Sequence, residues 1–156
     1  MRIGVISDSH GDIRAIKKVL EDAKDINLWI HAGDYSQDAE LVAGRNNTTI
    51  ITVAGNCDGA CKAKPDEFIE LEDKKIWVTH GHRYDVKQSY HQLLWWAKQY
   101  EVDIVIFGHS HVPEVKLLDS VLLVNPGSVS KPRWPKPTYA IIEIKNKIAE
   151  AQIVEF

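Results

Sequence analysis

The feature that most constrains this sequence is a set of short, continuous apolar runs, each of which stops at a polar cluster. A run of three to five apolar residues is too short for a helix and is typical of a strand buried on both faces. We interpret four segments as such strands: Ile3 to Ile6, Leu28 to Ile30, the β-branched Thr49 to Val53, and Ile104 to Phe107. The sequence therefore predicts a sheet core with helices on the outside.

Amphipathic segments between these runs predict the helices. Asp12 can cap a helix whose apolar stripe extends from Ile13 to Ala23 at helical spacing. A short helix is expected over Ala39 to Ala43, closed by Gly44. A third apolar stripe predicts a helix between Val86 and Ala97.

The second half of the chain reads mainly as strands. Residues 68–71 and 75–79 flank Glu72-Asp73-Lys74, a pattern that predicts a β-hairpin. Further strands are expected at Val115 to Leu118, Val121 to Val124, Tyr139 to Ile144 and Ile148 to Val154, with a tight turn at Asn146-Lys147. We therefore predict an α/β fold of two packed mixed β-sheets flanked by helices, an αββα sandwich, in one domain over residues 1–156.

Composition narrows the class of protein. The chain has 156 residues, 44% of them hydrophobic and 26% charged, which are ordinary values for a globular domain. A net charge of -3 gives no general attraction to nucleic acid, and no apolar stretch is long enough to span a membrane. The first apolar run is too short for an export signal, and two cysteines cannot make a disulfide-rich scaffold. We expect a cytoplasmic protein.

Residues that can bind metals follow five of the predicted strands. The five clusters are Asp8 with His10, Asp34, Asn56 with Asp58, His80 with His82, and His109 with His111. Ligands of open α/β sheets gather at the carboxyl ends of strands, so these distant residues are expected to meet there. Alone, the Asp-x-His, Gly-Asp and Gly-Asn-Cys-Asp clusters are usually turn chemistry, whereas the two histidine clusters are stronger signals because histidine is rare and both follow buried strands. Together, five clusters at five strand ends favour a metal site.

The ligand types indicate which metals fit. Carboxylate, amide and imidazole groups together suit Mn²⁺, Fe, Zn²⁺, Ni²⁺ or Co²⁺ better than Ca²⁺. A carboxylate can bridge two ions, and Asp34 stands centrally in the order of the clusters.

These clusters resemble the motifs of the calcineurin-like metallophosphoesterase superfamily. The family pattern is Asp-x-His, Gly-Asp, Gly-Asn-His-Asp/Glu, His-Gly and Gly-His-x-His. Here it stands as Asp8-Ser9-His10, Gly33-Asp34, Gly55-Asn56-Cys57-Asp58, His80-Gly81-His82 and Gly108-His109-Ser110-His111. The size of the chain and Asn125-Pro126-Gly127-Ser128 further resemble the small prokaryotic phosphodiesterase branch.

The resemblance implies a centre of two divalent ions, foremost Mn²⁺, with Ni²⁺, Zn²⁺, Fe, Co²⁺ or Mg²⁺ as other candidates. One ion would be held by Asp8, His10 and His111, the other by Asn56, His80 and His109, with Asp34 as the bridge. A hydroxide between the ions would attack the phosphorus of a small phosphate ester. The catalytic residues that follow from the family pattern are Asp34, Asn56, Asp58 and His82.

Cys57 departs from the family pattern, which often has histidine at this position to protonate the leaving group. A thiol with an ordinary pKa of about 8.5 is a poor substitute for that acid. We therefore expect a phosphodiesterase that favours good leaving groups and is slow on alkyl monoesters. Asp58 is expected to orient a ligand or a water. His82 either contacts phosphate or orients a ligand, or it is a solvated loop histidine.

Several alternatives stay open at this point. A scaffold of the same fold that binds proteins, a nuclease and a phosphomonoesterase are rival functions. Asn125 either touches the site or belongs to a plain β-turn, whereas His31 is read as structural and His91 as a surface residue. Adjacent Trp95 and Trp96 indicate either a homodimer or partner surface, or ordinary partial burial.

The loop from Lys131 to Pro137 carries Lys131, Arg133 and Lys136 around Trp134. These basic residues either meet an anionic substrate or form a solvated basic loop.

Overall fold

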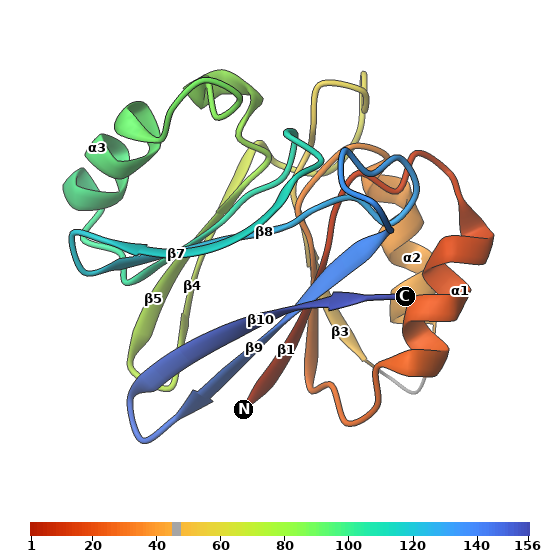
Figure 1. Ribbon diagram of the computed structural model, residues 1–156, viewed down its shortest axis with the longest axis horizontal. Helices are drawn as coiled ribbons and strands as arrows, with labels where there is room; N and C mark the ends of the chain where they lie inside the picture. Colours follow the sequence, from red (N-terminus) through yellow and green to blue (C-terminus); the bar gives the residue numbers. More distant parts are fainter. Residues whose placement is uncertain (45–47) are drawn as a thin grey trace.

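Two five-stranded β-sheets form the centre of the computed structural model, which describes residues 1–44 and 48–156 (Figure 1). The first sheet has the order β10-β9-β1-β2-β3. Its strands are β1 (Arg2–Ile6), β2 (Leu28–His31), β3 (Thr49–Thr52), β9 (Thr138–Lys145) and β10 (Ile148–Glu155). The strands β1, β2 and β3 are parallel, and β9 and β10 add an antiparallel edge.

The second sheet has the order β4-β5-β6-β8-β7. Its strands are β4 (Asp66–Leu71), β5 (Lys74–Thr79), β6 (Ile104–Ile106), β7 (Pro113–Leu118) and β8 (Val121–Pro126). The strands β5, β6 and β8 are parallel, and hairpins add β4 and β7 at the two edges. Both sheets are mixed, so the predicted fold class is confirmed.

Two-residue turns close the hairpins. The turn residues Glu72 and Asp73 have φ of 51° and 62°, and Asn146 and Lys147 have φ of 52° and 63°. Positive φ at both central residues is what a type I′ turn requires, and such turns match the twist of the paired strands. The predicted turn at Asn146-Lys147 is therefore confirmed.

The main hydrophobic core lies between the sheets. Ile3, Val5 and Ile30 of the first sheet pack there with Ile76 and Ile104 of the second, and all five side chains are at most 1% exposed. Alternate residues of the same strands face outward, as the pleat of a strand requires. The core thus fixes how the two sheets face each other.

The helices cover the outer faces of the two sheets (Figure 1). Helices α1 (Ile13–Asp22) and α2 (Ala39–Ala43) lie on the first sheet, where Ile16, Val19 and Val42 are buried against it. The N-cap of α1 is Asp12, as predicted. Helix α3 (His91–Gln99) covers the second sheet through Leu93 and Ala97. Short 3-10 turns at Ser36–Asp38 and His82–Tyr84 complete the order, and no helix among the described residues is long and apolar enough to cross a membrane.

The start predicted for the third helix was wrong. We expected a helix from Val86, but α3 begins only at His91. Residues 85–88 form a turn instead, in which the Gln88 amide donates to the Asp85 carbonyl at 2.9 Å, and Asp85 itself has a left-handed φ of 53° that does not occur within a right-handed helix. Val86 owes its apolar character to burial against the second sheet, with 4% exposure, rather than to a helical stripe.

Gly4 allows Trp29 to pack on the first sheet. A Cβ atom at Gly4 would lie 2.6 Å from Cε3 of the Trp29 side chain, which is 3% exposed. Replacing Gly4 by Ala should therefore lower the free energy of unfolding by about 1–3 kcal/mol, measured by urea denaturation. The control Gly44→Ala meets only the Glu40 carbonyl at 3.5 Å and should change stability by less than about 0.5 kcal/mol. Equal stability of the two variants would contradict this account of the packing.

Candidate metal centre

The loops that follow β1, β2, β3, β5 and β6 meet at one end of the two sheets, the upper end in Figure 1. Backbone hydrogen bonds join these loops across the chain. The Asp8 amide donates to the Gly33 carbonyl at 3.0 Å, and the Gly108 amide donates to the His80 carbonyl at 3.1 Å. These hydrogen bonds join the loop after β1 to the loop after β2, and the loop after β5 to the loop after β6, as expected for polar clusters that converge at the strand ends.

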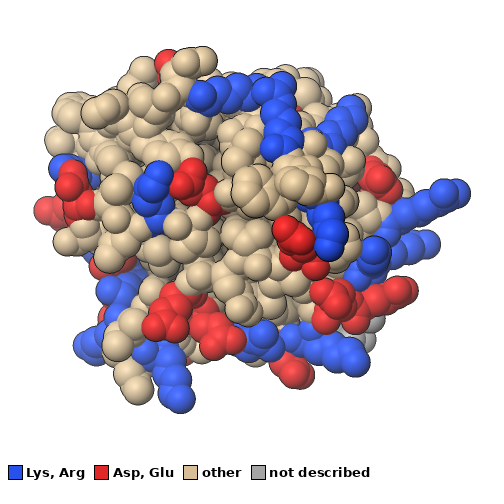
Figure 2. Space-filling view, viewed as in Figure 1, with Lys and Arg blue, Asp and Glu red and all other residues tan. Residues whose placement is uncertain are grey.

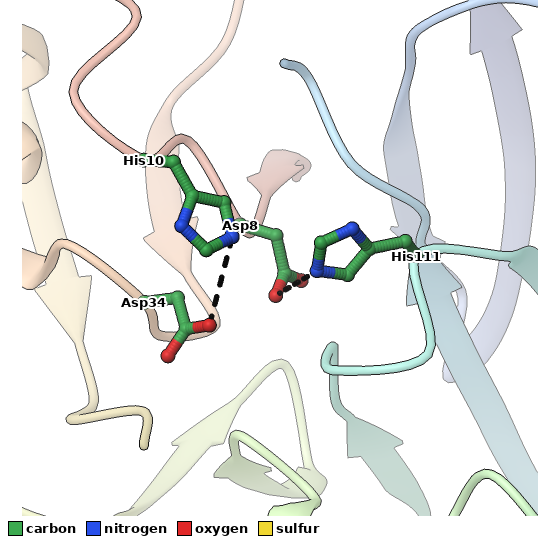
Figure 3. Close-up of side chains that lie close together, drawn as sticks. All are labelled: Asp8, His10, Asp34 and His111. Atoms are coloured by element: carbon green, nitrogen blue, oxygen red, sulfur yellow. Dashed lines mark ion pairs between the residues drawn. The ribbon is translucent and has the colours of Figure 1, made fainter. Parts of the chain in front are cut away.

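Four side chains of these loops form a compact group: Asp8, His10, Asp34 and His111 (Figure 3). One nitrogen or oxygen atom of each lies within 4.8 Å of those of the others. The His111 Nε2 atom is 3.0 Å from Asp8 Oδ1, and His10 Nε2 is 3.7 Å from Asp34 Oδ2. These are two carboxylates and two imidazoles in the geometry of a cation site.

Asp34 lies between this group and a second group of histidines. Its Oδ2 atom faces His10, and its Oδ1 atom is 3.4 Å from His80 Nε2. The His80 ring lies 5.1 Å from the His109 ring and 5.4 Å from the His82 ring, measured between centroids. The two oxygens of one carboxylate therefore face two separate sets of imidazoles.

Asn56 lies on the loop after β3, beside Asp34. Its side chain is exposed, and its Nδ2 atom is 3.4 Å from Cys57 Sγ. The neighbouring Cys57 amide donates to Asp34 Oδ1 at 2.8 Å. The backbone of this loop thus reaches the central carboxylate, while the Asn56 amide group points to its own neighbour.

Backbone carbonyls set the orientation of two of the histidines. His80 Nδ1 lies 2.7 Å from the Ala32 carbonyl, and His111 Nδ1 lies 2.6 Å from the Lys131 carbonyl. Because a carbonyl only accepts, each Nδ1 must carry the hydrogen. Each Nε2 atom then faces the carboxylates. A hydrogen bond to Asp8 raises the pKa of His111, and, against the lowering effect of burial, Asp34 and Asp8 raise the pKa of His80. Release of the Nε2 proton would leave a lone pair directed inward, which is the arrangement that metal-binding histidines commonly have.

Buried polar atoms without hydrogen-bond partners gather here. Within the described residues, six buried side-chain nitrogen or oxygen atoms make no well-aligned hydrogen bond. Four of them belong to this site: Asp8 Oδ1, His10 Nε2, His80 Nε2 and His82 Nδ1. The near neighbours of the first three are oppositely charged groups of the site itself. Buried polar atoms nearly always have a partner, so such a cluster calls for one. A divalent cation fits these donors.

The ionisation states also suit a cation. Burial alone would raise the pKa of Asp8, but His111 and His80 hold it below its ordinary value, and the pKa of Asp34 is lowered mainly by His80 against the same effect of burial. Both carboxylates are therefore negatively charged at neutral pH. Burial, helped by His80, lowers the pKa of His109 to about 4, so this imidazole is neutral and can donate a lone pair.

The backbone at the site adopts a conformation that non-glycine residues rarely have. The residues Asp8, His10, Asp34, His109 and His111 all have φ between 47° and 67°. This left-handed region costs roughly 1–2 kcal/mol for each residue, and such strain concentrates at functional sites. Holding these five residues in the left-handed conformation therefore lowers the stability of the fold, and it sets the direction of their side chains.

A buried hydrogen-bonded chain that the sequence did not reveal supports the Asp8–His10 loop. The Gly33 amide donates to His31 Nδ1 at 3.3 Å, so His31 Nε2 carries the hydrogen and donates to Ser9 Oγ at 2.8 Å. Ser9 Oγ in turn donates to Asp38 Oδ2 at 2.6 Å, and the Gly11 amide donates to the same oxygen at 2.9 Å. The structural role expected of His31 thus includes holding Ser9, which stands between two candidate ligands.

A second support comes from the segment after β8. Ser128 Oγ and Ser130 Oγ both donate to the Asp8 carbonyl, at 2.8 and 3.0 Å. Asn125 is fully buried, and its amide donates to the Gly108 carbonyl at 3.0 Å and to Ser110 Oγ at 2.9 Å. Asn125 therefore positions the His109–His111 loop and is more than a turn residue. The Asn-Pro-Gly-Ser motif was the signal in the sequence for this segment.

Asp58 binds backbone groups on both sides of the Asp34 loop. Its Oδ1 atom accepts from the Ser36 amide, and its Oδ2 atom accepts from the Gly55 amide at 2.7 Å. Gly55 itself approaches Asp34 so closely that a Cβ atom would lie 2.2 Å from Asp34 Oδ1. Only glycine fits there, which explains the Gly-Asn motif in physical terms.

Comparison with known proteins agrees with this geometry. Residues 1–147 match the model of the calcineurin-like phosphoesterase superfamily domain, and the chain belongs to this superfamily. A phosphodiesterase from Methanocaldococcus jannaschii is 33% identical over 164 residues, which cover 94% of this chain and 95% of the relative. The predicted resemblance is confirmed.

Solved structures extend the comparison to the fold. A conserved protein of Streptococcus pneumoniae, described as a predicted phosphoesterase, superposes with a TM-score of 0.81 at 32% identity, over 99% of this chain and 88% of that one. Vps29 of Entamoeba histolytica, solved in complex with Zn²⁺, has a TM-score of 0.80 over 99% of both chains. Its 21% identity shows a common fold and nothing further.

The Ser9–Asp38 contact gives a test of how the site is held. Asp38→Ala removes the acceptor of two buried hydrogen bonds, so it should lower the free energy of unfolding by about 1–3 kcal/mol. It should also weaken the binding of Mn²⁺ by about 10- to 100-fold, measured by calorimetry, because His10 loses its support. Asp38→Asn keeps an acceptor oxygen and should recover part of both losses.

The matched control is Asp12→Ala, which also removes a carboxylate that accepts two backbone hydrogen bonds near this loop. Loss of this helix cap should cost about 1 kcal/mol and leave Mn²⁺ affinity unchanged. If both variants bound Mn²⁺ like the unaltered protein, the chain through Ser9 would not position the site.

Proposed function

We propose that this protein is a metal-dependent phosphodiesterase. The observation that carries the proposal is the position of Asp34, whose two oxygens face His10 on one side and His80 on the other. Unpartnered buried atoms surround it, and the family to which the chain belongs is one of phosphoesterases. The proposed cofactor is a pair of divalent ions, foremost Mn²⁺, with Ni²⁺, Zn²⁺, Fe, Co²⁺ or Mg²⁺ as alternatives.

The proposed ligands divide into two sets around Asp34. Asp8, His10 and His111 form one set, supported by their mutual distances of at most 4.8 Å. Asn56, His80 and His109 form the other, supported by the close His80 and His109 rings. The exposed Asn56 side chain would have to turn from Cys57 toward His80 to complete this set.

When bound, such ions supply positive charge to the phosphate oxygens and lower the pKa of a bound water toward neutrality. The residues of the chain prepare the site for this chemistry. Asp8 and Asp34 keep their negative charge, and the carbonyls of Ala32 and Lys131 keep the Nε2 atoms of His80 and His111 directed inward. Asp58 fixes the backbone of the Asn56 loop, in line with the orienting role expected of it.

His82 and Cys57 are the two side chains that we consider for protonation of the leaving group. His82 lies beside His80 and His109, its Nδ1 atom has no partner, and burial lowers its pKa, so it is a neutral imidazole directed at the site. Burial and the Asp34 carboxylate raise the pKa of the Cys57 thiol to about 11. A thiol with that pKa is a poor proton donor, which supports a preference for good leaving groups.

One panel of assays tests the proposal. Metal-free protein is reconstituted with Mn²⁺, Ni²⁺, Zn²⁺ or Mg²⁺ and supplied with aryl diesters, aryl monoesters or cyclic nucleotides. Aryl diesters should be cleaved fastest, and Asp34→Asn should lower kcat at least about a hundredfold with every metal. The control His91→Ala changes an exposed histidine on α3 and should keep full activity. Full activity of Asp34→Asn would exclude Asp34 as the bridge.

The same panel separates the rival functions. Faster cleavage of monoesters would make the protein a phosphomonoesterase, and digestion of nucleic acid at low salt would make it a nuclease. Absence of hydrolysis with every metal would favour a protein-binding scaffold. The convergence of intact ligand residues around Asp34 is why we propose catalysis.

We further propose a homodimer and a cytoplasmic location. Two exposed free thiols, Cys57 and Cys61, suit a reducing compartment. An aromatic patch on and beside α3 supports the dimer: Trp95, Trp96, Tyr100 and Phe68 are 37% to 55% exposed, and their rings contact one another. Apolar surface of this kind is typical of protein contacts.

Sedimentation equilibrium tests the dimer. The unaltered protein should sediment with about twice the mass of one chain, and Trp95→Glu should yield monomers because a charge would be buried in the contact. Trp134→Glu changes another exposed tryptophan outside the patch and should leave the mass unchanged. A monomer at high concentration before any substitution would exclude the dimer.

A further inference from the structure

The loop between β8 and β9 is attached directly to the metal centre. His111 Nδ1 donates to the Lys131 carbonyl at 2.6 Å, and the Arg133 amide donates to the His111 carbonyl at 2.9 Å. Two hydrogen bonds to the same histidine hold residues 131–133 alongside it. The side chains of Lys131 and Arg133 are exposed, so they leave the backbone at the rim of the site.

The basic residues of this loop divide into two kinds. Lys136 Nζ lies 3.5 Å from Glu155 Oε2, and Trp134 Nε1 donates to Glu155 Oε1 at 3.1 Å. These two side chains are directed to β10. Lys131 and Arg133 take part in no ion pair among the described residues. Their positive charges are therefore available to a ligand.

The segment bonded to His111 thus carries two positive charges without an ion pair among the described residues, although the whole chain has a net charge of -3. Three nearby carboxylates already have other partners. Asp8 and Asp34 belong to the centre, and Asp58 accepts hydrogen bonds from backbone amides. Figure 2 shows Lys and Arg side chains at the upper edge of the molecule, over the loops that follow the strands in Figure 1. Positive charge at the mouth of a site attracts and orients anionic substrates.

We infer that the substrate is a phosphodiester that carries a second, terminal phosphate group, bound at the rim by Lys131 and Arg133. This inference rests on the proposed phosphodiesterase function. A simple diester has one negative charge, which the proposed metal ions would neutralise, so it would leave Lys131 and Arg133 without a partner. A terminal phosphate offers three oxygens, and a guanidinium group can bind two of them at once. Phosphorylated nucleotides are the small molecules with this chemistry.

A matched pair of chromogenic substrates tests the inference. Thymidine 5′-(p-nitrophenyl phosphate) and the same compound with a 3′-phosphate differ only in the second phosphate group. Release of nitrophenolate reports on the diester in both. With Mn²⁺ at low salt, kcat/KM should be about tenfold higher for the compound with the 3′-phosphate. This preference should shrink as salt rises, because the rim is exposed.

Substitutions assign the preference to residues. The double variant Lys131→Met with Arg133→Met should bring the ratio of the two kcat/KM values to about one. It should also weaken the binding of thymidine 3′,5′-bisphosphate, measured by calorimetry, which needs no turnover. The matched control is Lys136→Met, which removes a cation of the same loop that is already paired with Glu155. Its ratio should equal that of the unaltered protein.

The possible outcomes separate this inference from the proposed function. Hydrolysis of both substrates with no preference would overturn the inference and leave the phosphodiesterase intact. No hydrolysis of either substrate with any metal would overturn the proposed function itself. An equal loss of preference in Lys136→Met would show a general charge effect and overturn the assignment to Lys131 and Arg133. If a single-stranded oligonucleotide were cleaved faster than the phosphorylated nucleotide, the substrate would be a nucleic acid polymer and the inference of a small phosphorylated nucleotide would be wrong.

Discussion

Two buried carboxylates, Asp8 and Asp34, are the constraint on which the rest of the structure depends. Both are at most 2% exposed, and both keep their negative charge because imidazoles and backbone amides face them. Burying two like charges together is costly unless positive charge compensates them. The histidines, the supporting hydrogen bonds and the strained loops are all arranged around these two groups.

Much of this arrangement could be predicted from the sequence, because it follows from local patterns. The apolar run from Ile3 to Ile6 is typical of a buried strand, and parallel strands of this kind end at a common edge. Asp8, Asp34 and His109 were therefore expected to converge although about a hundred residues lie between the first and the last. The family motifs then indicated which of these residues are candidate metal ligands. The periodicity of apolar residues alone does not carry that information.

The parts that could not be predicted depend on contacts between distant residues. Ser9 and Asp38 meet only after the first sheet has formed. Ser9 occupies the variable position of the Asp-x-His motif, and Asp38 belongs to none of the motifs, so the sequence did not indicate their contact. The start of α3 was misjudged because Val86 has the right spacing for a helical stripe while a left-handed Asp85 precedes it. Backbone conformation of that kind leaves little trace in an aspartate, since aspartate tolerates several turn geometries.

The origin of the candidate ligands in two different sheets has a mechanical consequence. Asp8, His10 and Asp34 follow strands of the first sheet, whereas His80 and His111 follow strands of the second. A cation bound by both sets would link the two sheets directly. This link would add to the apolar contacts that otherwise hold the sheets together. The cohesion of the whole fold would then depend on how much metal its surroundings supply, since a ligand that binds only the folded state stabilises it by mass action.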